Sequence, residues 1–95
     1  MKELLMDASH WHVRDDLYLS FFQAVKAPEW HGKNFNALRD SIKAGQINRI
    51  EVPYCLVLKH YSMVPDDLRE TTRHFIDLIL ELAHEGVPIG TRIED

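Results

Sequence analysis

The chain has 95 residues, of which 45% are hydrophobic and 27% are charged, a composition that excludes a wholly disordered protein. We expect residues 1–95 to form a single domain around one hydrophobic core. The formal net charge is −4, and residues 66–95 alone carry eight acidic and three basic side chains. This charge disfavours direct binding to nucleic acid or to an anionic membrane, and it is compatible with a cationic partner surface.

The first half of the chain predicts one strand and two helices. Residues 2–6 form a short apolar segment that we interpret as a strand. Apolar residues recur at helical spacing within residues 15–26, and Pro28 ends that helix. A second, shorter helix begins after Gly32 with Asn34 as its N-cap, and its apolar face consists of Phe35, Leu38 and Ile42.

The second half predicts a strand, a long helix and a final strand. Residues 54–58 are almost continuously apolar, which is typical of a strand buried on both sides and therefore of a parallel sheet. A long helix begins at Pro65 and ends before Gly86, and residues 87–94 leave room for one short strand. This order predicts an α/β fold, with a small three-stranded parallel sheet and helices packed against it.

The sequence lacks the common nucleotide-binding, hydrolase and metalloprotease motifs, so we expect no enzymatic activity and no cofactor. His10 and His12 flank Trp11 and could supply two imidazoles to one metal ion. No third ligand follows at short spacing, so a loop role is favoured over a metal site. A small metal-dependent or hydrolytic enzyme centred on these two histidines remains an alternative.

The compartment follows from two features. Cys55 is the only cysteine, so an internal disulfide is excluded, and its apolar surroundings favour a core role. The first ten residues do not resemble a signal peptide, and no window approaches eighteen apolar residues. We therefore expect a cytoplasmic protein that is monomeric when free.

Three acidic residues repeat every four positions along the long helix, namely Asp77, Glu81 and Glu85. We expect them on the side opposite the apolar stripe, as an acidic ridge. Like charges at this spacing destabilise a helix, and Glu85 also faces the negative end of the helix dipole. A partner that selects these acids would explain the pattern. A solvated face relieved by Arg73 explains it equally well.

The stretch from Pro28 to Ile42 predicts a second surface. If the apolar face of the second helix is buried, then Asn36, Arg39 and Asp40 point outward, with Trp30 at the entrance to the helix. An aromatic residue beside an exposed carboxylate and an amide is typical of an interface centre. From the pattern alone, a core position for Trp30 with a solvated polar face is the simpler interpretation.

The same stretch closely resembles the signature of the barstar family. The matching residues are Pro28, Glu29, Trp30, His31, Gly32, Asn34, Phe35, Asn36, Ala37, Leu38 and Asp40. Residues 52–61 resemble the second strand of that family and residues 79–86 the end of its last long helix, so the resemblance covers nearly the whole chain.

The resemblance implies a barstar-like fold and an inhibitor of a small ribonuclease, of the antitoxin or immunity type, that protects the cell producing the nuclease. It implies that Trp30 is the interface aromatic and that Asp40 mimics an RNA phosphate in the nuclease active site. It further implies that Glu81 supports this contact, with Glu85 at the rim. Asn34 belongs to the same expected partner-binding surface.

Two residues depart from the family pattern. Asn36 occupies a position that is commonly aspartate, and Arg39 stands where barstar has tryptophan. Both remain in the expected partner-binding surface, but they imply a target different from barnase, with an acidic or neutral group facing Arg39. The alternative is a regulatory interaction module that uses the same scaffold to bind a partner that is not a nuclease.

Overall fold

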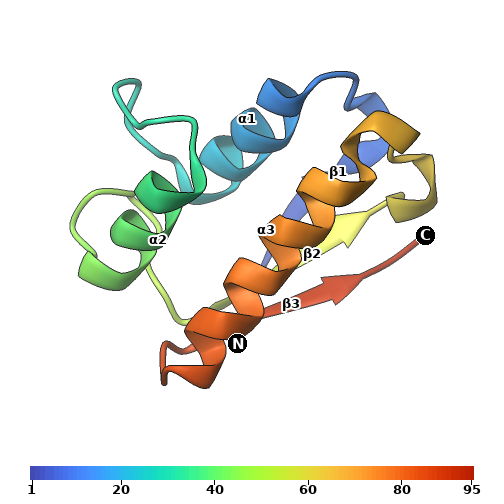
Figure 1. Cartoon of the computed structure of the whole chain (residues 1–95). Helices are drawn as coiled ribbons and strands as arrows, with labels where there is room; N and C mark the ends of the chain where they lie inside the picture. Colours follow the sequence, from blue (N-terminus) through green and yellow to red (C-terminus); the bar gives the residue numbers. More distant parts are fainter.

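The computed structural model of the protein describes residues 1–95 and contains the six predicted elements in the predicted order (Figure 1). They are β1 (Lys2–Asp7), α1 (Arg14–Val25), α2 (Phe35–Ala44), β2 (Tyr54–Lys59), α3 (Asp66–His84) and β3 (Ile89–Ile93). Short 3₁₀ turns, Ala8–His10 and Tyr61–Met63, follow the first two strands. None of the helices combines the length and the apolar character needed to cross a membrane.

The three strands form one parallel sheet in the order β1-β2-β3, which confirms the predicted α/β fold. Leu4 pairs with Leu56, and Leu56 pairs with Thr91. The three α-helices lie on one face of this sheet (Figure 1). Alternation along β1 shows the same arrangement, because Leu4 and Met6 are buried beneath the helices whereas Leu5 is exposed on the other face.

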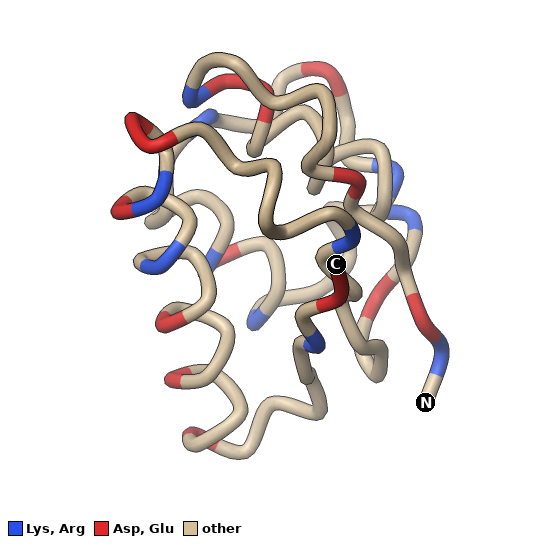
Figure 2. Tube along the Cα trace, turned by 90° about the vertical axis from the view of Figure 1, so that its right-hand side faces the viewer, with Lys and Arg blue, Asp and Glu red and all other residues tan.

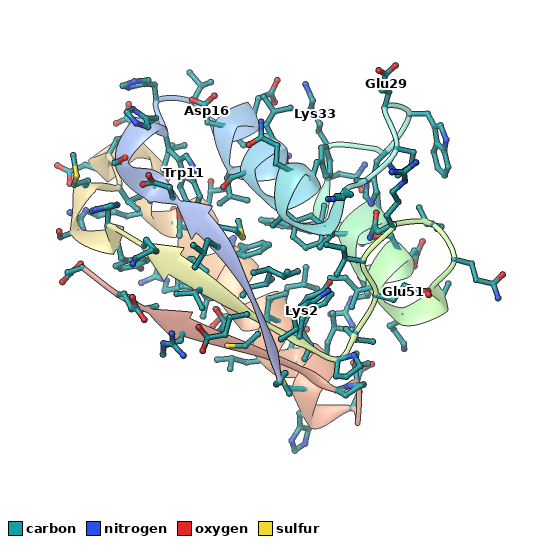
Figure 3. The ribbon with its side chains drawn as sticks, turned by 180° about the vertical axis from the view of Figure 1, so that it is seen from behind. Lys2, Trp11, Asp16, Glu29, Lys33 and Glu51 are labelled. Atoms are coloured by element: carbon teal, nitrogen blue, oxygen red, sulfur yellow. The ribbon has the colours of Figure 1, made fainter.

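The second face of the sheet carries no helix, as the view from behind shows (Figure 3). Val57 in the central strand is nevertheless only 1% exposed. Arg92 of β3 donates to both carboxylate oxygens of Glu3 in β1, over 2.7 and 3.1 Å, and this ion pair crosses β2. The prediction that residues 54–58 are covered on both sides is therefore correct for Val57, although an ion pair supplies part of the cover.

The core is a cluster of 20 buried residues between the sheet and the helices. Phe21 of α1 meets Phe75 of α3 edge-on, with ring centroids 6.0 Å apart. Each large apolar side chain buried in this way stabilises the fold by about 1.5–3 kcal/mol. The core therefore fixes α1 and α3 on the sheet, and α2 packs beside the C-terminal half of α3.

The helix ends lie close to where local signals predict them. Lys26 adopts a left-handed conformation (φ 54°) directly after α1, two residues before Pro28. Gly86 follows α3 with φ 99°, a conformation that glycine adopts without steric cost. The Asn34 side chain accepts a hydrogen bond from the Ala37 amide over 2.8 Å, which confirms its predicted role as the N-cap of α2.

Candidate functional site

The loop between α1 and α2 turns Trp30 outward and His31 inward. Trp30 is 74% exposed and His31 only 6% exposed, so the interpretation of Trp30 as a core residue is wrong. The His31 ring packs against Phe22 with centroids 4.7 Å apart. This loop projects from the body of the molecule, where Glu29 and Lys33 also reach into solvent (Figure 3).

Buried hydrogen bonds tie this loop to α2. His31 Nδ1–H donates to the Gly32 carbonyl oxygen over 3.0 Å, and Nε2 lies 2.8 Å from the Ser41 hydroxyl oxygen. The Ser41 hydroxyl has a single proton, and both Nε2 and the Leu38 carbonyl oxygen, 3.1 Å away, are placed to accept it. The Asn48 side-chain amide donates to the same Ser41 oxygen over 3.1 Å. No sequence motif predicted a role for these three side chains, which link the loop that carries the exposed tryptophan to α2.

Trp30 and Asp40 flank a shallow depression of about 190 Å³. His31 and Ser41 also line it. Asp40 is exposed and forms no salt bridge and no side-chain hydrogen bond within the chain. A partner group that enters this depression therefore meets an aromatic ring and a carboxylate that has no competing cation.

Two more predicted residues lie near the start of α2. Asn34 uses its side-chain oxygen to cap the helix, which gives it a structural role. A Cβ atom on Gly32 would come within 3.0 Å of the Asn34 side chain, so the residue at position 32 has to remain small. Asn36 is exposed and lines a groove of about 270 Å³ between α2 and α3. Asn36 therefore lies on the predicted surface, whereas the side chain of Asn34 stabilises the start of α2.

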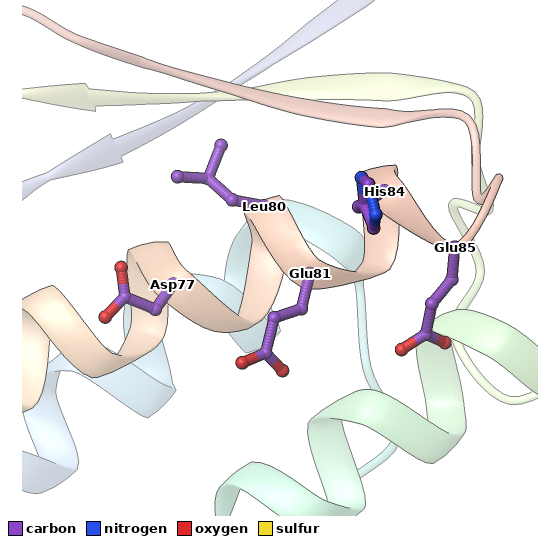
Figure 4. Close-up of a pocket in the computed structure, with 5 residues that line it drawn as sticks. All are labelled: Asp77, Leu80, Glu81, His84 and Glu85. Atoms are coloured by element: carbon purple, nitrogen blue, oxygen red, sulfur yellow. The ribbon is translucent and has the colours of Figure 1, made fainter.

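Arg39 lies in the same groove and forms ion pairs with two acids of α3. Its Nη2 donates to Glu81 over 2.6 Å and its Nη1 donates to Glu85 over 3.2 Å. Lys43, one turn further along α2, donates to the other oxygen of Glu85 over 3.1 Å. Figure 4 shows both glutamates pointing toward α2, whereas Leu80 points away from it. We call these four side chains, Arg39, Lys43, Glu81 and Glu85, the ionic cluster.

The ionic cluster changes the titration of its members. The hydrogen bond from Lys43 lowers the pKa of Glu85, and the hydrogen bond from Arg39 adds to this effect. The hydrogen bond to Glu81 raises the pKa of Arg39. All four side chains are solvent-accessible, so each ion pair contributes little to stability. The main effect of these ion pairs is on the charge of the surface, because two cations and two anions leave the ionic cluster without net charge.

The predicted acidic ridge requires correction in two respects. Its positions repeat along the C-terminal half of α3 (Figure 2), but four residues exceed one helical turn by about 40°. Glu81 and Glu85 therefore rotate away from the side opposite the apolar stripe and toward α2. The cations that pair with them come from α2, and Arg73 forms no ion pair. Only Asp77 stays opposite the stripe, also without an ion pair.

The alternative enzyme hypothesis is centred on His10 and His12, which flank Trp11. No group of three or more His, Cys, Asp or Glu side chains is placed to hold a metal ion. Trp11, between His10 and His12, is 3% exposed and belongs to the core cluster. The segment around Trp11 therefore contributes to packing.

The fold and this surface define a small α/β protein whose exposed aromatic and acidic side chains, on one loop and on α2, are suited to binding another protein. A family model described as Barstar (barnase inhibitor) matches residues 1–93. The chain belongs to the barstar family, which confirms the resemblance seen in residues 28–42. No curated protein shows a significant match to the chain. Members of this family are inhibitors and not enzymes.

Proposed function

We propose that this protein inhibits a small ribonuclease or nuclease toxin by covering its active site with Trp30 and Asp40. The observation that carries the proposal is an exposed tryptophan on a hydrogen-bonded loop beside an unpaired aspartate on α2, in a chain of the barstar family. Family membership favours this function over a regulatory module with a different partner.

The chemistry of the target supports a carboxylate as the inhibiting group. A ribonuclease binds a polyanion and therefore presents Arg, Lys or His side chains in its active site. A carboxylate that is held in place satisfies the same donors but offers no bond to cleave. Asp40 is available for this role because no cation of its own chain competes for it.

The geometry around Asp40 supports affinity as well as charge complementarity. Tryptophan is enriched among the residues that contribute most to protein interfaces, and its rigid ring loses little conformational entropy on binding. The buried contacts of His31 hold the adjacent loop before the partner arrives. Pre-organisation of this kind reduces the entropic cost of association.

The proposal extends to the remaining predicted residues. Asn36 contacts the nuclease through its amide, and the ionic cluster forms a rim in which Glu81 and Glu85 bind together with Arg39. The protein acts as a cytoplasmic monomer in the cell that makes the nuclease, and it binds the enzyme and not the RNA.

The test is inhibition of a ribonuclease encoded by a gene adjacent to that of this protein, which we expect to be its target. Asp40→Ala is expected to weaken inhibition by about 30-fold or more, which corresponds to about 2 kcal/mol and is typical of an interface hot spot. Asp67→Ala is the matched control, because Asp67 is also an exposed helical aspartate without an ion pair. Equal inhibition by both variants would contradict the proposal.

A further inference from the structure

We propose, on the basis of this inhibitory function, that Arg39 determines which nucleases the protein accepts. With Lys43, Arg39 neutralises the α3 end of the binding surface. The partner is then a nuclease with a cationic group opposite Asp40 but with no Lys or Arg opposite Glu81 and Glu85.

The contacts of the ionic cluster use the groups that a partner would otherwise reach. Both terminal nitrogens of Arg39 donate to α3, and both carboxylate oxygens of Glu85 accept from α2. One oxygen of Glu81 accepts from Arg39 over 2.6 Å. A nuclease cation that approaches these acids therefore finds three of their four carboxylate oxygens already paired.

Displacing Arg39 does not remove the obstacle. Its side chain is 29% exposed and lies between α2 and α3, whereas that of Glu81 is 62% exposed. The guanidinium stays attached to α2 and remains charged at any physiological pH. It would then lie beside the incoming cation, and a like-charge contact of this kind excludes a wrong partner more strongly than a missing contact does.

The opposite end of the surface accepts a cation. The depression between Trp30 and Asp40 contains no basic side chain other than His31, whose ring is buried and hydrogen-bonded. Apart from Asp40 and His31, the lining residues are uncharged. The surface is therefore complementary to a nuclease that places a cationic group against Asp40 and a flat surface against the Trp30 ring. The same nuclease would place neutral hydrogen-bonding groups against Glu81 and Glu85 of α3.

The experiment measures binding to barnase, the nuclease named in the description of the family, as a probe with a cationic active site. Arg39→Gln removes the charge but keeps side-chain donors. We expect it to bind barnase at least about tenfold more tightly than the unmodified protein does, with a steeper loss of affinity as salt increases. Arg39→Lys keeps the charge and is expected to reject barnase as the unmodified protein does.

A matched control separates the local charge from the net charge. Arg69→Gln changes the net charge equally, but Arg69 pairs with Asp66 at the other end of α3. Barnase binding by Arg39→Gln that does not exceed binding by Arg69→Gln would overturn the inference. Circular dichroism establishes that each variant is folded.

A measurement without any nuclease tests the ionic cluster directly. In NMR titrations of the free protein, the carboxyl group of Glu85 is expected to titrate at higher pH in Lys43→Gln and in Arg39→Gln than in the unmodified protein. Identical titrations in all three proteins would overturn the inference. The proposed function would then still stand if the unmodified protein inhibits its own ribonuclease and Asp40→Ala does not, so the two failures are distinguishable.

Discussion

The two ends of the binding surface carry the same kind of charged group in opposite states. At one end, Asp40 is exposed beside Trp30 and makes no ion pair. At the other end, Glu81 and Glu85 are exposed but pair with α2. Exposure alone therefore does not identify the acids that are free to bind a partner. Whether an exposed acid is free depends on the cations of the neighbouring helix, which here are Arg39 and Lys43 of α2.

The difference follows from how α2 is built. Arg39 and Lys43 are four residues apart, so they lie on the side of α2 that faces α3. Asp40 is one residue beyond Arg39 and is rotated by about 100° around the helix, toward the loop that carries Trp30. One helix thus neutralises the acids of its neighbour on one side and presents its own acid on another.

The largest expected effect distinguishes a tryptophan that stabilises the fold from one that binds the partner. Trp11 is 3% exposed within the core cluster, whereas Trp30 is 74% exposed. Trp11→Ala is expected to lower the free energy of unfolding by about 3–5 kcal/mol. Trp30→Ala is expected to leave stability nearly unchanged and to weaken nuclease binding. Urea denaturation and inhibition assays measure the two effects, and a large loss of stability in Trp30→Ala would contradict this assignment.

The second prediction addresses the two ends directly. Asp40→Asn and Glu81→Gln each replace a carboxylate by an amide of similar size. Asp40→Asn is expected to weaken inhibition of the protein's own nuclease by about 30-fold. Glu81→Gln is expected to change it by less than about threefold, because Arg39 already compensates that charge. Equal losses in both variants would show that the two ends do not differ.

The elements could be predicted because their signals are local. Asn34 as a cap and Pro28 and Gly86 as helix ends act on neighbouring residues, and the continuous apolar run at 54–58 identifies the central strand of the sheet. The pairing of Arg39 with Glu81 could not be predicted in this way, because these residues are 42 positions apart in the sequence and meet only when α2 packs against α3.

The orientation of the loop also depends on tertiary contacts. Trp30 and His31 are adjacent aromatic residues, and either could face the core. His31 faces inward because it meets Phe22 and the Ser41 hydroxyl, which come from two different helices.

The ionic cluster did have a signal in the sequence, since the basic residues at positions 39 and 43 have the same spacing as the acids at positions 81 and 85. That correspondence was the available indication of the ionic cluster.

The third prediction concerns the link between the loop and α2. His31→Ala removes one of the three hydrogen-bond partners of the Ser41 hydroxyl, which keeps a backbone carbonyl and a side-chain amide, and a single hydrogen bond contributes about 0.5–1.5 kcal/mol. We expect a loss of stability of this size, together with weaker nuclease binding, because Trp30 is then no longer held near Asp40. His10→Ala, at an exposed histidine, is the control and is expected to change neither property. Unchanged binding by His31→Ala would show that the loop needs no anchor.

The smallest expected effect concerns Asp7, a paired acid that lies outside the binding surface. Asp7 accepts hydrogen bonds from the Ser9 amide and the His60 ring, each over 2.9 Å, and the Ser9 contact does most to lower its pKa to about 2. In the unfolded chain an aspartate has a pKa of about 3.9. Asp7 therefore contributes stability above about pH 4, and this contribution is lost as the pH falls toward 2.

Asp7→Asn is accordingly expected to lower the melting temperature slightly at pH 7 and to approach the unmodified protein near pH 2. Asp40→Asn is expected to leave the melting temperature close to that of the unmodified protein, because Asp40 forms no salt bridge and no side-chain hydrogen bond within the chain. Thermal unfolding of the three proteins between pH 2 and pH 7 makes the comparison. If Asp40→Asn converged in the same way, Asp40 would have a partner within its own chain, and the distinction between the free end and the paired end would fail.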